Sequence, residues 1–438
     1  MSNTNFLSIT PQEFVLFLKK QNIRRCYFVY DPTTKRVKPS HSQLQPLAEF
    51  FENDTRDFST HEGIFLQLSK QYDTLLGAFV HRTNRGQAAG GVRYWQYPTM
   101  EEYLRDGLRL AKGMTHKNAL AGLWWGGGKG VMIHNPSVDK FDLKVRTSLY
   151  REFGELITSI RGCYVTAEDV GTNVTDMANV FATTRFTTCI PQNLGGSGNP
   201  SVPTARGVIC GMEAALQFLG QGTLEGKTVA VQGMGNVGAP LIKFLFEKNV
   251  KKVISVDISS QLVERGKKEF PGKNLDARTV VPGDQSIFST ECDILAPCAT
   301  GAILNPVTIP QLKAKIICGA ANNQLEDPVR DDIALVQRGI VYVPDFLANR
   351  MGIVTCADEQ YGYPNNDPAI EQHFNRKWEY SIHQMATKVL LSSKEKNIPP
   401  GKIAVQMAEE LSRVNHPIYG HRGEQIVHSL VENGWERE

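Results

Sequence analysis

Two lysines in the first half of the chain, Lys117 and Lys129, carry amines that could take part in catalysis. They are 12 residues apart and lie in largely apolar local sequence. If both face one cleft, burial and mutual repulsion each lower a lysine pKa. One amine could then act as a neutral base while the other stays positive opposite a substrate carboxylate. Most lysines are solvated surface residues, so the pattern alone leaves both interpretations open.

A glycine run at residues 126–128 directly precedes Lys129. It does not fit the phosphate-binding loop, because that motif needs Gly at position 123 and Ser or Thr at position 130. This chain has Leu123 and Gly130 there. Glycines before a lysine instead let a small substrate approach the backbone while the amine points into a cleft.

Two adjacent acids, Glu168 and Asp169, follow a short apolar segment and precede Gly171 and Thr172. Asp169 could relay protons. Alternatively, the two acids could begin a turn and cap the helix that follows, since Asp is a preferred N-cap residue. From these residues alone, the cap is the favoured interpretation.

A glycine-rich turn in the second half, residues 233–238, has the pattern G-x-G-x-x-G directly after an apolar segment. Such glycines allow a tight turn and close approach to a pyrophosphate, which the following helix N-terminus binds. A second predicted strand ends in Asp257, 24 residues after Gly233, which could bind the ribose hydroxyls. No Arg follows directly, which favours NAD over NADP because the carboxylate would repel a 2′-phosphate. The alternative is a glycine turn needed only for packing.

The elements around these residues alternate between helix and strand. Helical apolar spacing predicts helices over residues 99–119, 142–160, 204–219 and 382–394. Short apolar segments bounded by Gly, Pro, Asp or Asn predict strands over residues 130–134, 228–232, 253–256, 294–296, 316–318 and 341–343. The alternation predicts an α/β protein of two domains around a cleft, the second a Rossmann-like doubly wound sheet.

The composition changes abruptly at Gly195–Pro200, which is the best candidate for a hinge. We therefore expect a substrate-binding, catalytic and oligomerisation domain over residues 1–195, with a tail of about residues 411–438 packing back on it. Residues 200–410 form the expected NAD-binding domain. No role can be assigned to the first 80 residues.

Composition excludes several classes of protein. The chain has 438 residues, 41% of them hydrophobic, and a net charge of +3. It is too apolar for a disordered chain and has no apolar run of roughly 20 residues for a membrane span. Clustered Lys and Arg are lacking, so neither nucleic acid nor membrane is an expected partner. Eight cysteines without a CxxC pair, and no secretory signal, predict reduced thiols and a cytoplasmic location. The histidines lack ligand spacing, so no metal is expected.

Taken together, these segments resemble the Glu/Leu/Phe/Val amino-acid dehydrogenases, and most closely the leucine dehydrogenases among them. The resemblance runs in order from about residue 80 to about residue 395. The matching stretches are residues 90–93, 110–115, 117–119, 126–129, 166–172, 197–201, 229–237, 291–294, 296–299, 321–325, 357–359 and 361–363.

The resemblance implies a homo-oligomer that catalyses the NAD-dependent, reversible oxidative deamination of an apolar, leucine-like L-amino acid to its 2-oxo acid and ammonia. It implies that Lys117 binds the substrate α-carboxylate. Lys129 would activate the attacking water, and Asp169 would exchange protons with the substrate amine. The other substrate-side residues that it implies are Ala89, Gly127, Gly128 and Asn349. On the cofactor side it implies Thr204, Gly233, Gly235, Asn236, Val237, Gly238, Asp257, Cys298, Ala299 and Asn323.

Three departures from the family pattern leave alternatives open. Arg350-Met351 stand where the family has Ala-Gly, so a bulky cation could crowd or recognise part of a substrate. Trp124-Trp125 either face the substrate or belong to the core. Ala89 stands where glutamate dehydrogenases have a lysine for the distal carboxylate, which argues against glutamate. The alternatives are a dehydrogenase of the same fold for an aromatic or unusual amino acid, and a catalytically silent NAD-binding regulatory protein.

Overall fold

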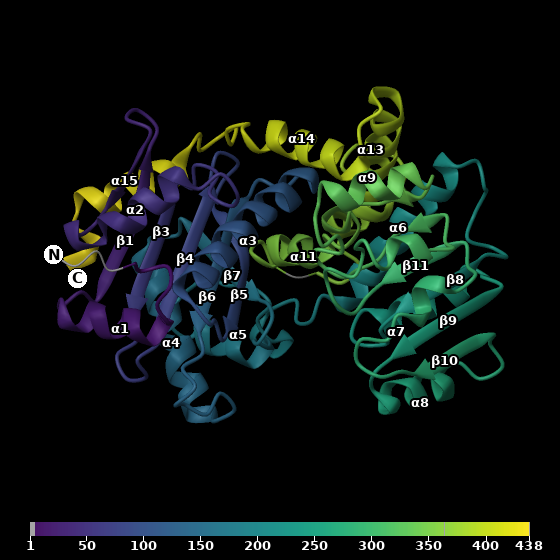
Figure 1. Cartoon of the computed structure of the whole chain (residues 1–438), viewed down its shortest axis with the longest axis horizontal. Coiled ribbons are helices and arrows are strands. Elements are labelled where there is room, and N and C mark those ends of the chain that lie inside the picture. Colours follow the sequence, from purple (N-terminus) through teal and green to yellow (C-terminus); the bar gives the residue numbers. More distant parts are fainter. Residues whose placement is uncertain (1–4, 363, 438) are drawn as a thin grey trace.

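The computed structural model describes residues 5–362 and 364–437 and has two lobes, each built on one β-sheet (Figure 1). Tyr363, which belongs to the last stretch that carries the family resemblance, lies outside the described residues. Among the described helices, none is long and apolar enough to cross a membrane. The predicted α/β architecture of two domains is confirmed.

The N-terminal lobe has a mixed sheet of seven strands in the order β2-β1-β3-β4-β6-β5-β7. In chain order its strands are β1 (Arg25–Asp31), β2 (Arg36–Pro39), β3 (Gly63–Leu68), β4 (Leu75–Arg82), β5 (Ala88–Trp95), β6 (Gly126–Ile133) and β7 (Tyr164–Glu168). Its helices are α1 (Pro11–Lys20), α2 (Gln45–Asn53), α3 (Met100–Leu120), α4 (Leu143–Ser159) and α5 (Val174–Phe181). Strand β5 runs parallel to both β6 and β7, so the carboxyl ends of these three strands share one edge.

Helices α3 and α4 confirm the helices predicted over residues 99–119 and 142–160. Each helix begins directly after a residue whose side chain caps it. The Thr99 side chain accepts a hydrogen bond from Glu102 N at the start of α3. Asp142 accepts from Lys144 N and Val145 N at the start of α4. Such caps pair backbone donors that the first helical turn leaves free.

The C-terminal lobe has a parallel sheet of six strands in the order β10-β9-β8-β11-β12-β13, which confirms the predicted doubly wound sheet. Its strands are β8 (Thr228–Gln232), β9 (Lys252–Asp257), β10 (Leu275–Thr279), β11 (Ile294–Pro297), β12 (Ile316–Ile317) and β13 (Val341–Tyr342). Its helices include α6 (Ser201–Phe218), α7 (Gly238–Glu247), α8 (Ser260–Glu269), α9 (Arg330–Gln337), α10 (Asp345–Ala348) and α13 (Ile382–Lys396). The prediction missed β10, since only one residue of this edge strand is buried and the strand lacks an apolar run.

Strand β6 begins earlier than predicted, because the glycines before Lys129 belong to the strand itself. A Cβ atom on Gly127 would lie 2.0 Å from Thr115 Oγ1 of α3, and one on Gly128 would lie 2.7 Å from the Tyr164 ring. A side chain at position 127 would therefore push α3 off the sheet, whereas one at position 128 would clash on the opposite face of the sheet. Gly127 allows α3 to pack directly on β6.

The end of the chain returns to the N-terminal lobe (Figure 1). After α11 (Met351–Glu359), α12 (Pro368–Glu371) and α13, helix α14 (Pro400–Ser412) leads to α15 (Arg422–Glu432). Trp435 is fully buried there, with its ring 5.2 Å from that of Phe65 and its Nε1 donating to Ser159 Oγ at 2.9 Å. The last residues thus complete the core of the first sheet.

We expect Trp435→Ala to lower the melting temperature clearly, because removing a buried Trp costs about 3–5 kcal/mol. Differential scanning calorimetry of the full chain measures the change. Trp95→Ala is the matched control, since that ring is half exposed. Equal melting temperatures for the two variants would contradict the packing described here.

Candidate active site

Lys129 and Asp169 come together at the shared edge of the N-terminal sheet. Lys129 lies on β6 and is buried, and its Nζ is 2.7 Å from Asp169 Oδ2. Asp169 follows β7 directly and does not cap the next helix, so the interpretation favoured from the sequence was wrong. The N-cap of α5 is Asn173, which forms a capping box with Asp176. Asp169 is therefore free to face Lys129.

A second cation, Arg93 of β5, also faces Asp169. Its Nε lies 3.4 Å from Asp169 Oδ2, and its Nη1 donates to both carboxylate oxygens of Asp106 at 3.1 and 2.9 Å. Burial by itself would raise the pKa of Asp169, but Lys129 and Arg93 outweigh it and hold that pKa below its usual value. The sequence analysis gave Arg93 no role, although a charged residue in an otherwise apolar strand was a usable signal.

Lys117, in the last turns of α3, reaches residues of the other lobe. Its Nζ donates to Asn322 Oδ1 at 3.3 Å. Burial lowers the pKa of Lys117, the Asp345 carboxylate opposes this, and the nearby Lys129 ammonium adds to the lowering. The two lysines and Asp169 therefore lie close enough to influence one another electrostatically.

Asn349 joins the same group of side chains. Its Nδ2 donates to Asn322 Oδ1 at 2.8 Å and to Ala320 O at 3.0 Å. Its Oδ1 is buried and has no hydrogen-bond partner within the described residues. A buried acceptor without a partner costs free energy, so this oxygen is suited to a donor on a bound molecule.

The prediction singled out Asn323, whereas the residue that contacts Lys117 and Asn349 is its neighbour Asn322. The Asn323 side chain is exposed, and its carbonyl accepts a hydrogen bond from Ala302 N at 2.7 Å. Adjacent identical residues gave the sequence no means of distinguishing the two.

The residues of the predicted dinucleotide site lie at the carboxyl edge of the second sheet. Gly233 follows β8 with φ +94°, a region that favours glycine. A Cβ atom on Gly238 would lie 2.0 Å from Gly233 O, whereas the space beside Gly235 is open. Val237 precedes α7, and neither it nor any other side chain caps that helix. An open space, glycines and free amides beside Asn236 fit a pyrophosphate.

Asp257 ends β9, next to β8 in the sheet. Its Oδ2 accepts from Met234 N at 2.7 Å, which places the carboxylate against the glycine turn. Cys298 and Ala299 follow β11 on the other side, and Cys298 N donates to Gln232 O at 2.8 Å. From β8 the chain builds the sheet outward through β9 and β10 on one side and then through β11, β12 and β13 on the other. Open parallel sheets bind ligands at the carboxyl ends of the strands where the strand order reverses in this way.

Thr204 lies in the first turns of α6, and its Oγ1 donates to Pro200 O at 2.9 Å. A Cβ atom on Gly352 of α11 would lie 3.8 Å from that Oγ1. Thr204 is thus placed beside the segment that carries Asn349. On the N-terminal lobe, Ala89 is buried in β5 opposite Gly127 of β6.

The departures from the family pattern have structural explanations. The Trp124 ring is 41% exposed and lies 4.2 Å from Arg85 Cζ and 5.4 Å from the His416 ring. Trp125 is buried and belongs to the apolar core of the N-terminal lobe. Arg350 is fully buried, and its guanidinium donates to the carbonyls of Leu120 and Tyr380.

Comparison with known proteins agrees with this arrangement. The family model described as "Glu/Leu/Phe/Val dehydrogenase, dimerisation domain" matches residues 71–186. The model "Glutamate/Leucine/Phenylalanine/Valine dehydrogenase" matches residues 195–267 and 257–416. Leucine dehydrogenase of Geobacillus stearothermophilus is 46% identical over 332 residues, which are 76% of this chain and 85% of the relative. Phenylalanine dehydrogenase of Lysinibacillus sphaericus is 39% identical over 292 residues, 66% of this chain and 74% of that relative.

Solved structures show the same fold. The crystal structure of L-tryptophan dehydrogenase from Nostoc punctiforme has a TM-score of 0.66 and 33% identity, covering 80% of this chain and 96% of that one. The hetero-hexameric glutamate dehydrogenase from Thermus thermophilus has a TM-score of 0.64 at 20% identity, covering 78% and 84%. Fold and site together define an amino-acid dehydrogenase. The chain belongs to the Glu/Leu/Phe/Val dehydrogenase family.

The position of Arg93 generates a prediction about pH. Arg93→Gln removes a cation beside Asp169, so the pKa of Asp169 rises. If the reaction needs the ionised carboxylate, the acidic limb of kcat/KM against pH moves upward by about one unit. Arg109→Gln is the matched control, because among the described residues Arg109 also binds Asp106 but forms no ion pair with Asp169. An unshifted acidic limb in Arg93→Gln would show that Arg93 does not control this carboxylate.

Proposed function

We propose that this protein catalyses the NAD-dependent, reversible oxidative deamination of an apolar, branched-chain L-amino acid to its 2-oxo acid and ammonia. The proposal rests on Lys117, which reaches Asn322 of the other lobe and lies within electrostatic reach of the Lys129–Asp169 pair. Asn349 binds the same Asn322 side chain. It assigns substrate binding and catalysis to residues 1–195, supported by the tail at 411–438, and NAD binding to residues 200–410.

Each side chain has a distinct task in this proposal. The Lys117 ammonium binds the α-carboxylate of the substrate, which replaces Asn322 Oδ1 as its partner. Asn349 Oδ1, an acceptor without a partner, receives a hydrogen bond from the substrate or the nicotinamide carboxamide. The backbone at Gly127 and Gly128 and the small side chain of Ala89 border the substrate.

The chemistry requires a proton acceptor for the amine and an activated water. NAD, when bound, supplies the acceptor for the hydride that leaves Cα. Asp169, held ionised by two neighbouring cations, takes a proton from the substrate amine and later returns it to the departing ammonia. By hydrogen bonding, Lys129 activates the water that adds to the imine and stabilises the negative charge on its oxygen. The proton that this water loses passes to Asp169 once that carboxyl group has returned the first proton to nitrogen.

The cofactor side uses the edge of the second sheet. The amides at Gly233–Gly238, among them those of Asn236 and Val237, bind the pyrophosphate, and Asp257 binds the ribose hydroxyls. Thr204, Cys298, Ala299 and Asn323 border the nicotinamide. The fit of the glycine turn and the carboxylate to NAD supports this assignment, as do the leucine dehydrogenase relatives.

An apolar side chain on the substrate is favoured because Ala89 offers no cation for a distal carboxylate. The relatives named leucine dehydrogenase support a branched chain. The similarity to the tryptophan dehydrogenase structure keeps an aromatic substrate as the second candidate. The Trp124 contacts with Arg85 and His416 weaken the earlier argument that this ring shapes the substrate site.

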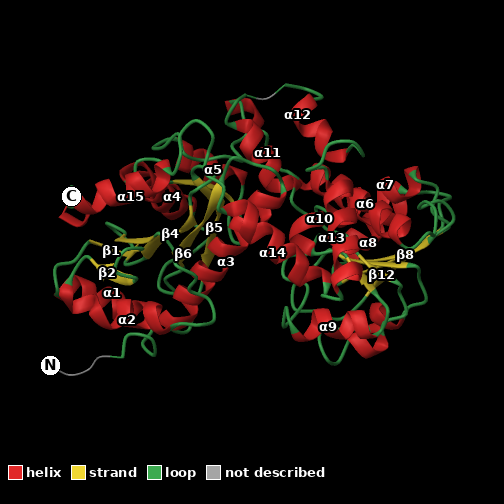
Figure 2. Cartoon of the chain, turned by 90° about the horizontal axis from the view of Figure 1, so that it is seen from above, coloured by secondary structure: helices red, strands yellow, loops and turns green. Residues whose placement is uncertain are grey.

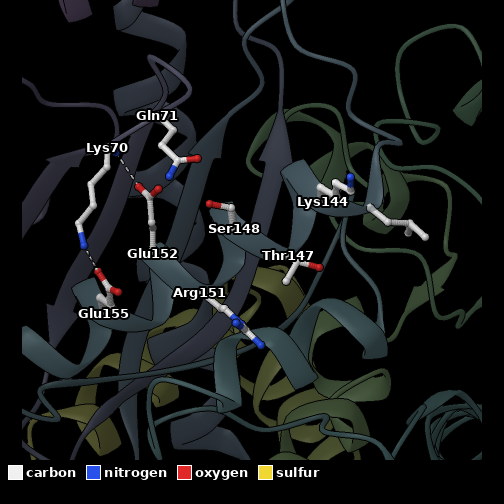
Figure 3. A pocket seen from close by; sticks show the side chains of 9 residues that line it. Lys70, Gln71, Lys144, Thr147, Ser148, Arg151, Glu152 and Glu155 are labelled. Carbon is white, nitrogen blue, oxygen red and sulfur yellow. Dashed lines mark hydrogen bonds and ion pairs between the residues drawn. The ribbon is translucent and has the colours of Figure 1, made fainter.

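We further propose that the protein is a cytoplasmic homo-oligomer. The family model over residues 71–186 describes a dimerisation domain, and Phe141 and Leu143 expose large apolar side chains within it. Leu143 borders a surface groove along α4 that contains none of the proposed catalytic residues (Figure 3). In this groove Lys70 Nζ pairs with Glu155 Oε2 at 2.7 Å.

The central test is a panel of L-amino acids with NAD, followed by NADH absorbance. We expect leucine, valine and isoleucine to be turned over faster than phenylalanine, tryptophan and glutamate. Lys129→Ala should lower kcat at least about a thousandfold, because it removes a general catalyst and the charge that stabilises the transition state. Lys388→Ala, on the exposed side of α13, is the control.

Faster turnover of an aromatic substrate would favour the second candidate. Equal turnover by wild type and Lys129→Ala would overturn the proposed mechanism. Absence of turnover with every amino acid, despite NAD binding, would favour a regulatory protein.

The cofactor preference has its own test. Asp257→Asn keeps an acceptor for Met234 N but removes the negative charge. We expect kcat/KM with NADP relative to NAD to rise about fivefold, because repulsion of the order of 1 kcal/mol against the 2′-phosphate is lost. Steady-state kinetics with both cofactors measures the ratio. A ratio that stays at the wild-type value would mean that Asp257 does not select the cofactor.

A further inference from the structure

Arg350 is a fully buried guanidinium, 0% exposed, for which the described part of the chain provides no carboxylate. It directly precedes α11, the helix that lies between the two lobes in Figure 1; Figure 2 shows the same two lobes from above. Burial lowers the pKa of Arg350 to about 9. A buried cation without a counter-ion is costly, so its position calls for a physical explanation.

The guanidinium bridges two backbone carbonyls from separate segments. Its Nη1 donates to Leu120 O at 2.5 Å, and its Nη2 donates to Tyr380 O. Leu120 is the last residue of α3, where helix carbonyls lack partners and carry partial negative charge. The planar fork of arginine suits two acceptors at once, and a lysine ammonium does not reproduce that geometry.

The residues around this bridge are closely packed, and we call the contact of residues 120–122 with Arg350 and Tyr380 the joint. Gly122 follows α3 with φ +72°, and a Cβ atom on it would lie 2.7 Å from the Tyr380 ring. Leu120 and Ala121 belong to the apolar core of the C-terminal lobe, together with Met351 and Ile382. The end of α3 is thus embedded in the lobe opposite to the one that holds its beginning.

The joint adjoins the proposed substrate-binding lysine. Lys117 O accepts a hydrogen bond from Ala121 N, so Lys117 lies in the turn that Arg350 caps. Asn349, the residue before Arg350, contacts Asn322, which accepts from Lys117 Nζ. Arg350 therefore binds the helix end next to the Lys117 backbone, and Asn349 binds the Asn322 side chain that accepts from the Lys117 amine.

We propose that Arg350 is a positioning residue that fixes Lys117 relative to the cofactor-binding lobe, by clamping the end of α3 to the segment at Tyr380. The inference rests on the proposed function, since it assumes that Lys117 binds the substrate carboxylate. Arg350 acts through α3 and has no contact with substrate in this account. This assignment replaces the expectation that the cation crowds or recognises the substrate.

The test uses the full-length enzyme and three variants. Arg350→Met removes the bridge, and Arg350→Lys keeps the charge but spans only one carbonyl. Arg376→Met is the control for loss of an arginine near this segment, because the Arg376 guanidinium binds Glu213 of α6 rather than the end of α3. The measurements are kcat, the separate KM values for amino acid and NAD, and hydrogen–deuterium exchange of the peptide covering residues 119–125.

We expect Arg350→Met to raise KM for the amino acid about tenfold, with KM for NAD unchanged, because a displaced Lys117 weakens carboxylate binding alone. Exchange at residues 119–125 should rise in the same variant. Arg350→Lys should lie between wild type and Arg350→Met in both measurements, and Arg376→Met should match wild type. If Arg350→Met fails to fold, Arg350→Lys is compared with wild type and with Arg376→Met in the same measurements.

Unchanged exchange and unchanged KM in the Arg350 variants would overturn the proposal. So would an equal rise of both KM values, or the same effect in Arg376→Met, since either result indicates general destabilisation. A wild-type enzyme without amino-acid turnover would refute the proposed function instead. The exchange measurement would then still decide whether Arg350 clamps α3.

Discussion

The arrangement of the site depends on the contact between α3 and the glycine strand β6. Because Gly127 has no side chain, the helix can lie close to the strand, with Thr115 where a Cβ would otherwise be. Lys117 on the helix and Lys129 on the strand are thereby brought into one region. A larger residue at position 127 would separate the two amines. Gly127 therefore contributes to the geometry of the site whether or not a substrate touches its backbone.

The two lobes are linked by polar contacts as well as by apolar packing. Lys117 reaches Asn322, Arg350 reaches Leu120, and Glu359 at the end of α11 accepts from Cys189 N and Ser197 N. Each contact joins segments far apart in sequence. Hydrogen bonds of this kind depend on orientation, so they fix the relative placement of the lobes more closely than apolar contacts alone.

Much of this fold could be predicted from the sequence, because buried parallel strands and capped helices leave strong local patterns. The range of β8 and the helix predicted over residues 99–119, which the structure shows as α3, are examples. The arrangement of the site was harder to predict, since its contacts join residues that are far apart in the sequence. Asp169 resembled a helix cap until the structure showed Asn173 in that role. Nothing near Arg350 in the sequence indicated that two carbonyls, at Leu120 and Tyr380, would surround it.

The position of Trp435 has a consequence for biosynthesis. The sheet that it covers is built from strands between β1 and β7, all of which leave the ribosome before the C-terminal lobe is made. Phe65 and Ser159 therefore lack their partner, Trp435, until that residue has been synthesised. During translation this face of the nascent lobe stays uncovered, a period in which chaperones can bind it and self-association can compete.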